Sequence, residues 1–560
     1  MQVSKSFRNI ILIELLMPVT LLVFGIYHGL MQVIYRSGLI HASAMAKIDY
    51  YQGLTLHGVI NAVVLTTFFA VAFGHATIIY YLKKEPNKLL SRISMWLMII
   101  GTLMAAAAMF SGQASVLYTF YPPLRATPFF YLGAALLIIG SWFAFFAWVK
   151  VYRQWRKENP RVKTPLAVLG TIINFTVWFV CTLAVGYEVL VMLLPWSIGF
   201  VKTINVPLAR MLFWFFGHAL VYFWLLPSYI MFYTMLPKIA GGKLYSDNAG
   251  RLALFLFLIL SVPVGVHHQF SEPVFERSTK LFQSILTYGV AIPSFVTAFT
   301  IAASLEYAGR KRGAKGLLGW TKKLPYWDKN NFLFAYLICG LILFIFGGAT
   351  GIVNASYSLN NIVHNTDWMP GHFHMTVAGP VFLAILGMSI YLLSKLSGKE
   401  IRYKNFVTIV PYLWLIGILL FSTGLMWGGL LGEPRRTNLG MTYTNPENSL
   451  YNPEWVPTTM LTLVGGIIMT VSAVLYFWAF FATIFSKKSF EPHLDFPTAE
   501  VIHEERELPI LNNFRPWLVL MVIVILVAYI PALTDTFKFN GPDAPPYNID
   551  NPMPVDLNKF

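Results

Sequence analysis

The sequence predicts an all-α polytopic membrane protein with about 13 transmembrane helices. Of the 560 residues, 56% are hydrophobic and only 12% are charged, about half the charged fraction of ordinary soluble domains. Apolar runs of about 20 residues, the length that crosses the hydrocarbon core, recur along the whole chain. The segments between them alternate between rich and poor in Lys and Arg, as expected for loops on opposite sides of a membrane.

The expected spans follow one another almost from end to end. They are 9–34, 52–82, 93–115, 128–149, 165–195, 211–236, 252–270, 281–306, 332–354, 369–394, 407–432, 458–486 and 516–536. The first is too long for a signal peptide and lacks a small-residue cleavage site, so we expect it to be a membrane helix. No soluble domain is evident, and 1–560 is expected to be a single membrane-embedded domain with a tail over 537–560.

The loop charges predict the orientation. Basic loops such as "KKEPNKLLSR" and "KVYRQWRKENPRVK" fall on the side of the N-terminus and hold most of the 41 Lys and Arg residues. The positive-inside rule then places the N-terminus in the cytoplasm and the C-terminal tail outside the cell (inner) membrane. The net charge of +16 is therefore a topology signal, and no nucleic-acid partner is expected. Cys181 and Cys339 lie far apart within spans, which argues against a thiolate metal site or a disulfide framework.

Six of the 12 histidines fall at one depth, in the outer third of the predicted membrane. They are His57, His218, His267, His268, His372 and His374. Ionisable residues inside a membrane indicate a functional site, and neutral imidazole is a favoured ligand of iron and copper. We therefore expect a metal centre there.

The stretch "WMPGHFHMTV" places His372 and His374 about 200° apart around a helix, so they cannot easily serve one metal. They could hold two planar cofactors on the two sides of that helix. His57 could supply the opposite axial ligand of one, which gives one haem with two histidines and one haem with an open face. The other three histidines form a three-imidazole set suited to copper.

Four strings carry a family resemblance: "YQGLTLHGV", "WFFGHALVYFWLLPSY", "VPVGVHHQF" and "WMPGHFHMTVAG". In this order and spacing they resemble subunit I of haem–copper oxygen reductases, closest to the B-type cytochrome c oxidases of thermophiles, over about residues 50–436. The resemblance implies the fold of that subunit and a terminal respiratory oxidase. Such an oxidase reduces dioxygen to water, takes protons from the cytoplasm and pumps protons outward.

The resemblance also implies the cofactors and their ligands. His57 and His374 would ligate a low-spin haem b, and His372 a high-spin a-type haem. The remaining three histidines, His218, His267 and His268, would hold copper B. Tyr222 lies four residues after His218 on the same helix face. In the family this tyrosine is joined covalently to the copper histidine and supplies an electron and a proton, so His218 and Tyr222 are the expected catalytic residues.

A column of hydroxyl groups lies inward of these histidines. Its members are Tyr222, Tyr229 and Tyr233 in one span, Ser294, Thr297 and Thr300 in another, and Ser246 at the inner start of a third. Such a column can order water and pass protons, although stripes of Ser, Thr and Tyr also serve helix packing. The positions resemble the B-type proton path, and we expect a proton path here.

A second, carboxylate-based proton path is not supported. A-type oxidases carry a glutamate in the string "HPEVY", whereas this chain reads "HALVY" with Leu220 at that place. Glu14 and Glu188 lie within spans but fit no path, and we expect them to be paired or near a partner.

On the outer side, adjacent Arg435 and Arg436 suit haem propionates, because guanidinium groups pair well with carboxylates. The resemblance places such a pair there, with His364 in the neighbouring outer segment. B-type relatives typically carry an aspartate where this chain has Asn360, which puts in doubt a carboxylate role at that position.

Two other functions fit parts of the pattern. A nitric oxide reductase shares the six histidines but uses non-haem iron with nearby glutamates and lacks Tyr222; a haem b electron carrier or a transporter needs no three-histidine set. For an oxidase, the expected electron donor is cytochrome c through a subunit II with a dinuclear copper centre, because this chain has no cysteine pair for one. A quinol donor and a small single-helix accessory subunit are alternatives that stay open.

Overall fold

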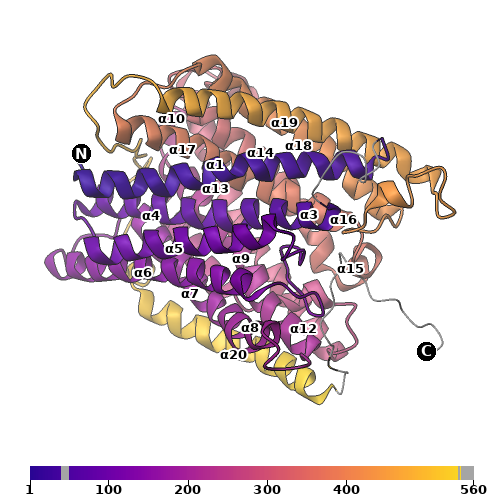
Figure 1. The fold of residues 1–560 in the computed structure, drawn as a ribbon. Coiled ribbons are helices and arrows are strands. Elements are labelled where there is room, and N and C mark those ends of the chain that lie inside the picture. Colours follow the sequence, from indigo (N-terminus) through magenta and orange to yellow (C-terminus); the bar gives the residue numbers. More distant parts are fainter. Residues whose placement is uncertain (40–48, 540–542, 544–560) are drawn as a thin grey trace.

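The computed structural model describes residues 1–39, 49–539 and 543. Its helices run side by side along one common direction, and the N-terminus and the end of the last described helix, α20 (Phe514–Lys538), lie at opposite ends of the bundle (Figure 1). Within the described residues, 12 helical segments are long and apolar enough to cross a membrane. The predicted class, an all-α multi-pass membrane protein, is confirmed.

The helices long enough to span are built from one or several elements. They are α1 (Lys5–Arg36); α3 (Tyr50–Val59), η1 (Ile60–Val64) and α4 (Leu65–Leu82); α5 (Lys88–Phe110); α6 (Pro128–Glu158); α7 (Leu166–Tyr187), η2 (Glu188–Leu193) and α8 (Leu194–Ser197); α9 (Val206–Thr234); α12 (Arg277–Gly289) and α13 (Ala291–Lys311); α14 (Leu333–Ala355); α16 (Trp368–Phe373), η5 (His374–Val381) and α17 (Phe382–Ser397); α18 (Lys404–Leu430); η7 (Pro453–Trp455) and α19 (Val456–Ile484); and α20 (Phe514–Lys538). Shorter elements are α10 (Leu236–Ile239), α11 (Asp247–Leu260), η3 (Val266–Gln269), η4 (Gly319–Lys323), α15 (Tyr357–Val363), η6 (Leu439–Met441) and η8 (Pro509–Asn512).

Polar residues begin many of these helices. The side-chain oxygens of Ser4, Asn87, Asn205 and Ser246 each accept a hydrogen bond from a backbone N–H of the first turn. These caps satisfy donors that have no partner within the helix, which matters most where lipid replaces water.

One predicted span, 252–270, is not a continuous helix, and this prediction is wrong. Helix α11 ends at Leu260, an irregular segment follows, and the short 3₁₀ turn η3 then carries His267 and His268. Pro263 removes a backbone donor in the segment between them. Gly265 lets the segment pack closely on α9, since a Cβ there would lie 2.5 Å from the carbonyl oxygen of Trp214.

Three helices contain a π-helical turn, a feature often found at functional sites. The turn η1 begins three residues after His57, η5 begins at His374, and η2 begins at Glu188. Within η5, Pro380 cannot donate to the carbonyl of Thr376 four residues earlier, which disrupts regular α-helical bonding. Two of the three π turns therefore lie at histidines predicted to bind metal.

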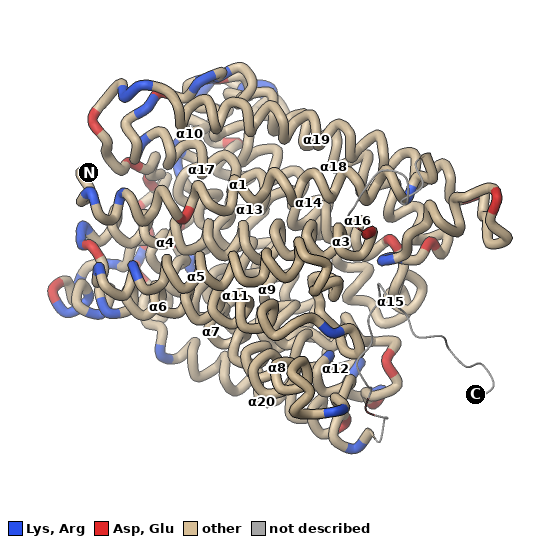
Figure 2. Tube along the Cα trace, viewed as in Figure 1, with Lys and Arg blue, Asp and Glu red and all other residues tan. Residues whose placement is uncertain are grey.

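Most charged residues lie at the two ends of the bundle, and Lys and Arg gather at the end that holds the N-terminus (Figure 2). Helix α9 lies in the interior, packed against α4, α7, α14, α20 and η5. Most of the predicted tail 537–560 lies outside the described residues.

Helices α5 and α6 approach closely at Gly101 and Gly133, where a Cβ on Gly101 would lie 2.5 Å from the Gly133 carbonyl oxygen. Small residues at such crossings allow close packing in membranes.

We expect Gly101→Val to lower the free energy of unfolding by about 1–3 kcal/mol through overpacking. The measurement is thermal unfolding of the purified protein. Gly186→Ala is the control, because no atom lies within 4 Å of its Cβ position; equal melting temperatures for both variants would contradict this packing.

Candidate functional site

All six predicted ligand histidines line one cavity of about 660 Å³ in the bundle. This volume lies in the range of about 300–1,000 Å³ that is usual for ligand and cofactor sites. The histidines reach the cavity from α3, α9, η3, α16 and η5. The six histidines that the sequence predicts at one depth therefore line one cavity.

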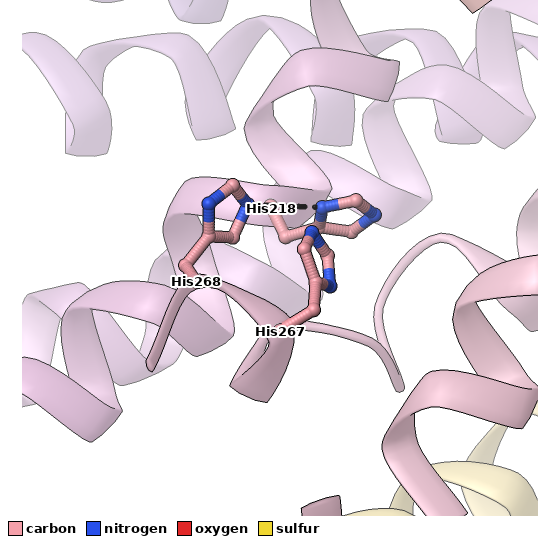
Figure 3. Close-up of side chains that lie close together, drawn as sticks. All are labelled: His218, His267 and His268. Atoms are coloured by element: carbon pink, nitrogen blue, oxygen red, sulfur yellow. Dashed lines mark hydrogen bonds between the residues drawn. The ribbon is translucent and has the colours of Figure 1, made fainter. Parts of the chain in front are cut away.

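Three of the histidines form a compact triad (Figure 3). His218 projects from α9, and His267 and His268 project from η3. One ring nitrogen from each lies within 4.8 Å of the others. His218 Nδ1 and His268 Nε2 are 3.3 Å apart, close to the separation of about 3.3 Å expected for two nitrogens on one tetrahedral metal with bonds of about 2.0 Å.

Neighbouring side chains hold the triad in place. The Thr287 hydroxyl donates to the Gln283 carbonyl at 2.7 Å, so its oxygen accepts from His267 Nδ1 at 3.2 Å. This leaves Nε2 as the free nitrogen of His267. The Trp214 ring stacks on His268, with ring centroids 3.8 Å apart and planes 11° from parallel. His218 Nε2 is buried and has no hydrogen-bond partner among the described residues.

His57 and His374 face each other across another part of the cavity. Their ring centroids are 6.1 Å apart and their planes differ by 12°. Nδ1 of His57 donates to the Gly25 carbonyl at 2.8 Å, and Nδ1 of His374 donates to the Pro370 carbonyl at 2.7 Å. Both rings therefore keep Nε2 for a ligand. Two imidazoles on one iron, with bonds of about 2 Å, place their centroids roughly 6 Å apart, so the pair fits a haem iron.

His372 is fixed in the same manner on the other side of its helix. The Thr350 hydroxyl donates to the Gly347 carbonyl at 2.8 Å, and its oxygen accepts from His372 Nδ1 at 2.9 Å. A Cβ at Gly351 would lie only 3.1 Å from the His372 ring, so a glycine gives this ring room. One ring nitrogen is again left for a cofactor.

Tyr222 lies one turn from His218 on α9, with ring centroids 5.1 Å apart, and it lines the same cavity. The predicted hydroxyl column is partly assembled. The hydroxyls of Tyr229 and Ser294 are 3.3 Å apart, and the Tyr233 hydroxyl donates to Thr297 Oγ1 at 2.8 Å.

Two other members of the column bond elsewhere. The Thr300 hydroxyl donates to the Val296 carbonyl, and Ser246 caps α11. Among the described hydrogen bonds, none joins either residue to the tyrosines. Sequence reasoning missed Ser304, whose hydroxyl donates to the Thr300 carbonyl and accepts from the backbone of Tyr245. Its spacing of one helical turn from Thr300 could have identified Ser304 from the sequence.

Beyond the end of α18, Arg435 and Arg436 are both part of the cavity wall. Arg435 Nε, Arg436 Nη2 and His364 Nε2 are buried without a hydrogen-bond partner among the described residues. Burial, assisted by the Arg436 charge, lowers the pKa of Arg435 to about 10. Burial and the Arg435 charge also lower the pKa of His364 to about 4. The unpaired guanidinium donors of Arg435 and Arg436 favour an anionic group such as a haem propionate.

The two membrane glutamates differ. Glu14 Oε2 accepts from His75 Nδ1 at 3.2 Å, and His75 Nε2 contacts the Ser91 hydroxyl at 3.1 Å, so Glu14 is paired as expected. Glu188 is buried, and neither of its carboxyl oxygens has a hydrogen-bond partner in the part of the chain that the structure describes.

The cavity and its histidines lie within a segment that matches a known protein family. Residues 9–468 match the family described as Cytochrome C and Quinol oxidase polypeptide I. The chain belongs to the haem–copper oxidase subunit I family. It is a catalytic subunit I and a homologue of cytochrome c oxidase, a membrane-bound oxidoreductase of the respiratory chain. Membership implies haems and copper B, and the triad fits a copper B site.

Individual relatives support the same family assignment. The chain is 42% identical over 502 residues to cytochrome c oxidase subunit 1 of Thermus thermophilus, covering 88% of each chain. It is 28% identical over 486 residues to heme-copper oxidase subunit I+III of Aeropyrum pernix, covering 81% of this chain and 54% of that one. It also superposes on a chain of a heme-copper terminal oxidase dimer solved by cryo-EM, with a TM-score of 0.96, 48% identity and coverage of 100% and 97%.

The Thr287 hydroxyl supplies a test of the triad. Thr287→Val removes the acceptor that orients His267, and loss of such a partner typically weakens metal affinity about 10–100-fold. We expect the variant to release its triad metal at correspondingly lower chelator concentration. Thr534→Val, whose hydroxyl bonds only its own helix on α20, is the control. Equal metal retention in both variants would contradict the orienting role.

Proposed function

We propose that this chain is the catalytic subunit of a terminal oxidase that reduces dioxygen to water. The observation that carries the proposal is that the His218–His267–His268 triad and His372 line one cavity. The triad would hold copper B, and His372 would hold a high-spin a-type haem with one open face. A haem iron and a copper ion side by side supply the binding site and the electrons for dioxygen reduction.

His57 and His374 would hold the low-spin haem b that delivers electrons. The parallel rings and their hydrogen-bonded Nδ1 atoms support this assignment. Only Phe373 separates His374 from His372, so one helix would bring both haems together. Arg435 and Arg436 would bind the propionates through their unpaired donors, with His364 beside them as the third member of this group.

The chain's own groups would supply protons. Tyr222 lines the cavity beside His218, and we infer that its phenol provides a proton and an electron, with the covalent link to His218 that the family resemblance implies. Protons would reach it from the inner side through Ser246, Thr300, Thr297, Tyr233, Ser294 and Tyr229. The contacts Tyr233–Thr297 and Tyr229–Ser294 support the middle of this path.

The concentration of Lys and Arg at the N-terminal end of the bundle supports an orientation with that end in the cytoplasm (Figure 2). The host would be the inner cell membrane, the path above would start at the cytoplasmic side, and protons would be pumped outward. The chain 1–560 would form one catalytic domain with an outer tail.

Electrons would come from cytochrome c through a subunit II with a dinuclear copper centre; a quinol donor is the alternative. A single-helix accessory subunit would cover part of the lipid-facing surface. A nitric oxide reductase is disfavoured, because the candidate metal group found among the described residues contains histidines alone and no carboxylate. Purification with subunits intact, followed by assays with cytochrome c and with quinol, would identify the donor.

The ligand assignment has a direct test. His267→Ala should remove the triad metal and abolish oxygen reduction, while the optical spectrum of the low-spin haem persists, because His57 and His374 are untouched. Metal analysis, oxygen consumption and visible spectra measure the three effects. The control is His503→Ala, an exposed histidine away from the cavity. Loss of both haems together with the copper would contradict the proposed division of ligands.

The proton path has a separate test. Thr297→Val removes the hydroxyl that accepts from Tyr233, so steady-state turnover should fall about tenfold or more, since a proton-transfer group typically contributes 10²–10⁴-fold. Metal and haem content should stay unchanged. Thr176→Val is the matched control, because that hydroxyl bonds only its own helix on α7. If both variants turn over like the parent, the path does not run through Thr297.

A further inference from the structure

A buried charged cluster at the outer end of the cavity has no role in the cofactor assignments above. Arg36 ends α1, Asp367 precedes α16 and Glu433 follows α18. Asp367 and Glu433 are each 1% exposed, and Arg36 is 8% exposed. Arg36 and Asp367 line the cavity, whereas Glu433 is not among its lining residues.

One guanidinium group binds both carboxyls. Arg36 Nη2 donates to Asp367 Oδ2 and, at 3.0 Å, to Glu433 Oε1. The same Arg36 donates through Nη1 to the Thr437 carbonyl at 3.0 Å, and Glu433 Oε2 accepts from the Thr458 hydroxyl at 2.9 Å. The Asp367 backbone N–H also donates to the Glu433 carbonyl at 2.8 Å, so the two acids are fixed relative to each other.

The cluster contains two carboxyls and one guanidinium group, so it lacks one positive charge if both carboxyls are ionised. Tyr50 packs beside Arg36, and its hydroxyl donates to the Thr437 carbonyl. Arg435 acts on Asp367 only through its charge, since its Nη2 donates to Asn365 Oδ1 at 2.8 Å. Arg436 lies over the Tyr118 and Tyr121 rings.

Two buried carboxylates cannot both stay ionised beside one guanidinium without a large desolvation cost. Two acids in one site commonly solve this by sharing a proton. In agreement, burial raises the pKa of Asp367 well above its ordinary range; Arg36 opposes this rise, and the neighbouring Glu433 adds to it. Gly428 leaves room for the pair, because a Cβ at that position would overlap the Glu433 carboxyl.

We propose that Asp367 and Glu433 share one proton and pass protons from the cavity towards the outer surface. Asp367 takes up the proton on the cavity side. The O–H bond on Asp367 then breaks as an O–H bond forms on Glu433, and no electron is transferred. Glu433 lies in the loop between α18 and α19, on the outer side. The role of this pair in turnover rests on the proposed function, whereas the sharing of one proton between the two carboxyls does not.

The test is infrared pH-difference spectroscopy of the oxidised holoenzyme between neutral and alkaline pH. Ordinary carboxyls are ionised throughout this range, so a vanishing C=O band that shifts in D₂O reports a carboxyl that still holds a proton at neutral pH. Asp367→Asn and Glu433→Gln should each abolish the band, because Arg36 balances the single carboxylate that remains. Asp367→Glu keeps two carboxyls and should retain it.

Glu454→Gln is the control, an exposed acid in the same outer loop that should leave the band unchanged. A band that is identical in the parent, Asp367→Asn and Glu433→Gln would overturn the proposal, as would the absence of any band in the parent. If one variant loses its haems, the other decides. Oxygen consumption by the parent separates the two levels: a band without oxygen consumption contradicts the proposed function alone, and oxygen consumption without a band contradicts the carboxyl pair alone.

Discussion

Four of the six imidazoles in this cavity have one nitrogen committed to a hydrogen bond with the protein, and the site depends on that commitment. Gly25, Pro370, Thr350 and Thr287 hold the Nδ1 atoms of four histidines. A neutral imidazole has one donor and one acceptor nitrogen, so the bonded Nδ1–H leaves Nε2 free to bind a metal. The same bonds satisfy polar groups that would be costly in hydrocarbon. Ligand orientation and membrane stability therefore have one physical cause.

The helices depart from regular geometry where this cavity requires it. The π turns η1 and η5 adjoin His57 and His374, and the break after α11 frees η3 to carry two adjacent histidines. The break lets η3 leave the line of α11, and from there both histidines reach one site with His218. The loss of regular backbone bonding is tolerated because these segments are buried in protein and do not face lipid.

Hydropathy predicted nearly all of the spans, because membrane length and apolar composition are local properties of the sequence. It failed at 252–270, where Pro263 and Gly265 matter more than mean hydropathy. The six histidines followed from depth, and helical spacing placed the tyrosines and the Ser/Thr residues in one column, but the contacts Tyr233–Thr297 and Tyr229–Ser294 within it are seen only in the structure. The Arg36–Asp367–Glu433 cluster did not, because it joins three segments far apart in the chain and only the fold brings them together.

The central claim is that two haem irons and one copper share the cavity in the stated places. Anomalous scattering from crystals of the holoenzyme at the iron and copper absorption edges would locate each metal directly. The account predicts copper within the His218–His267–His268 triad, one iron between His57 and His374, and a second iron at His372. Iron within the triad, or a metal-free triad in an enzyme that reduces oxygen, would contradict it.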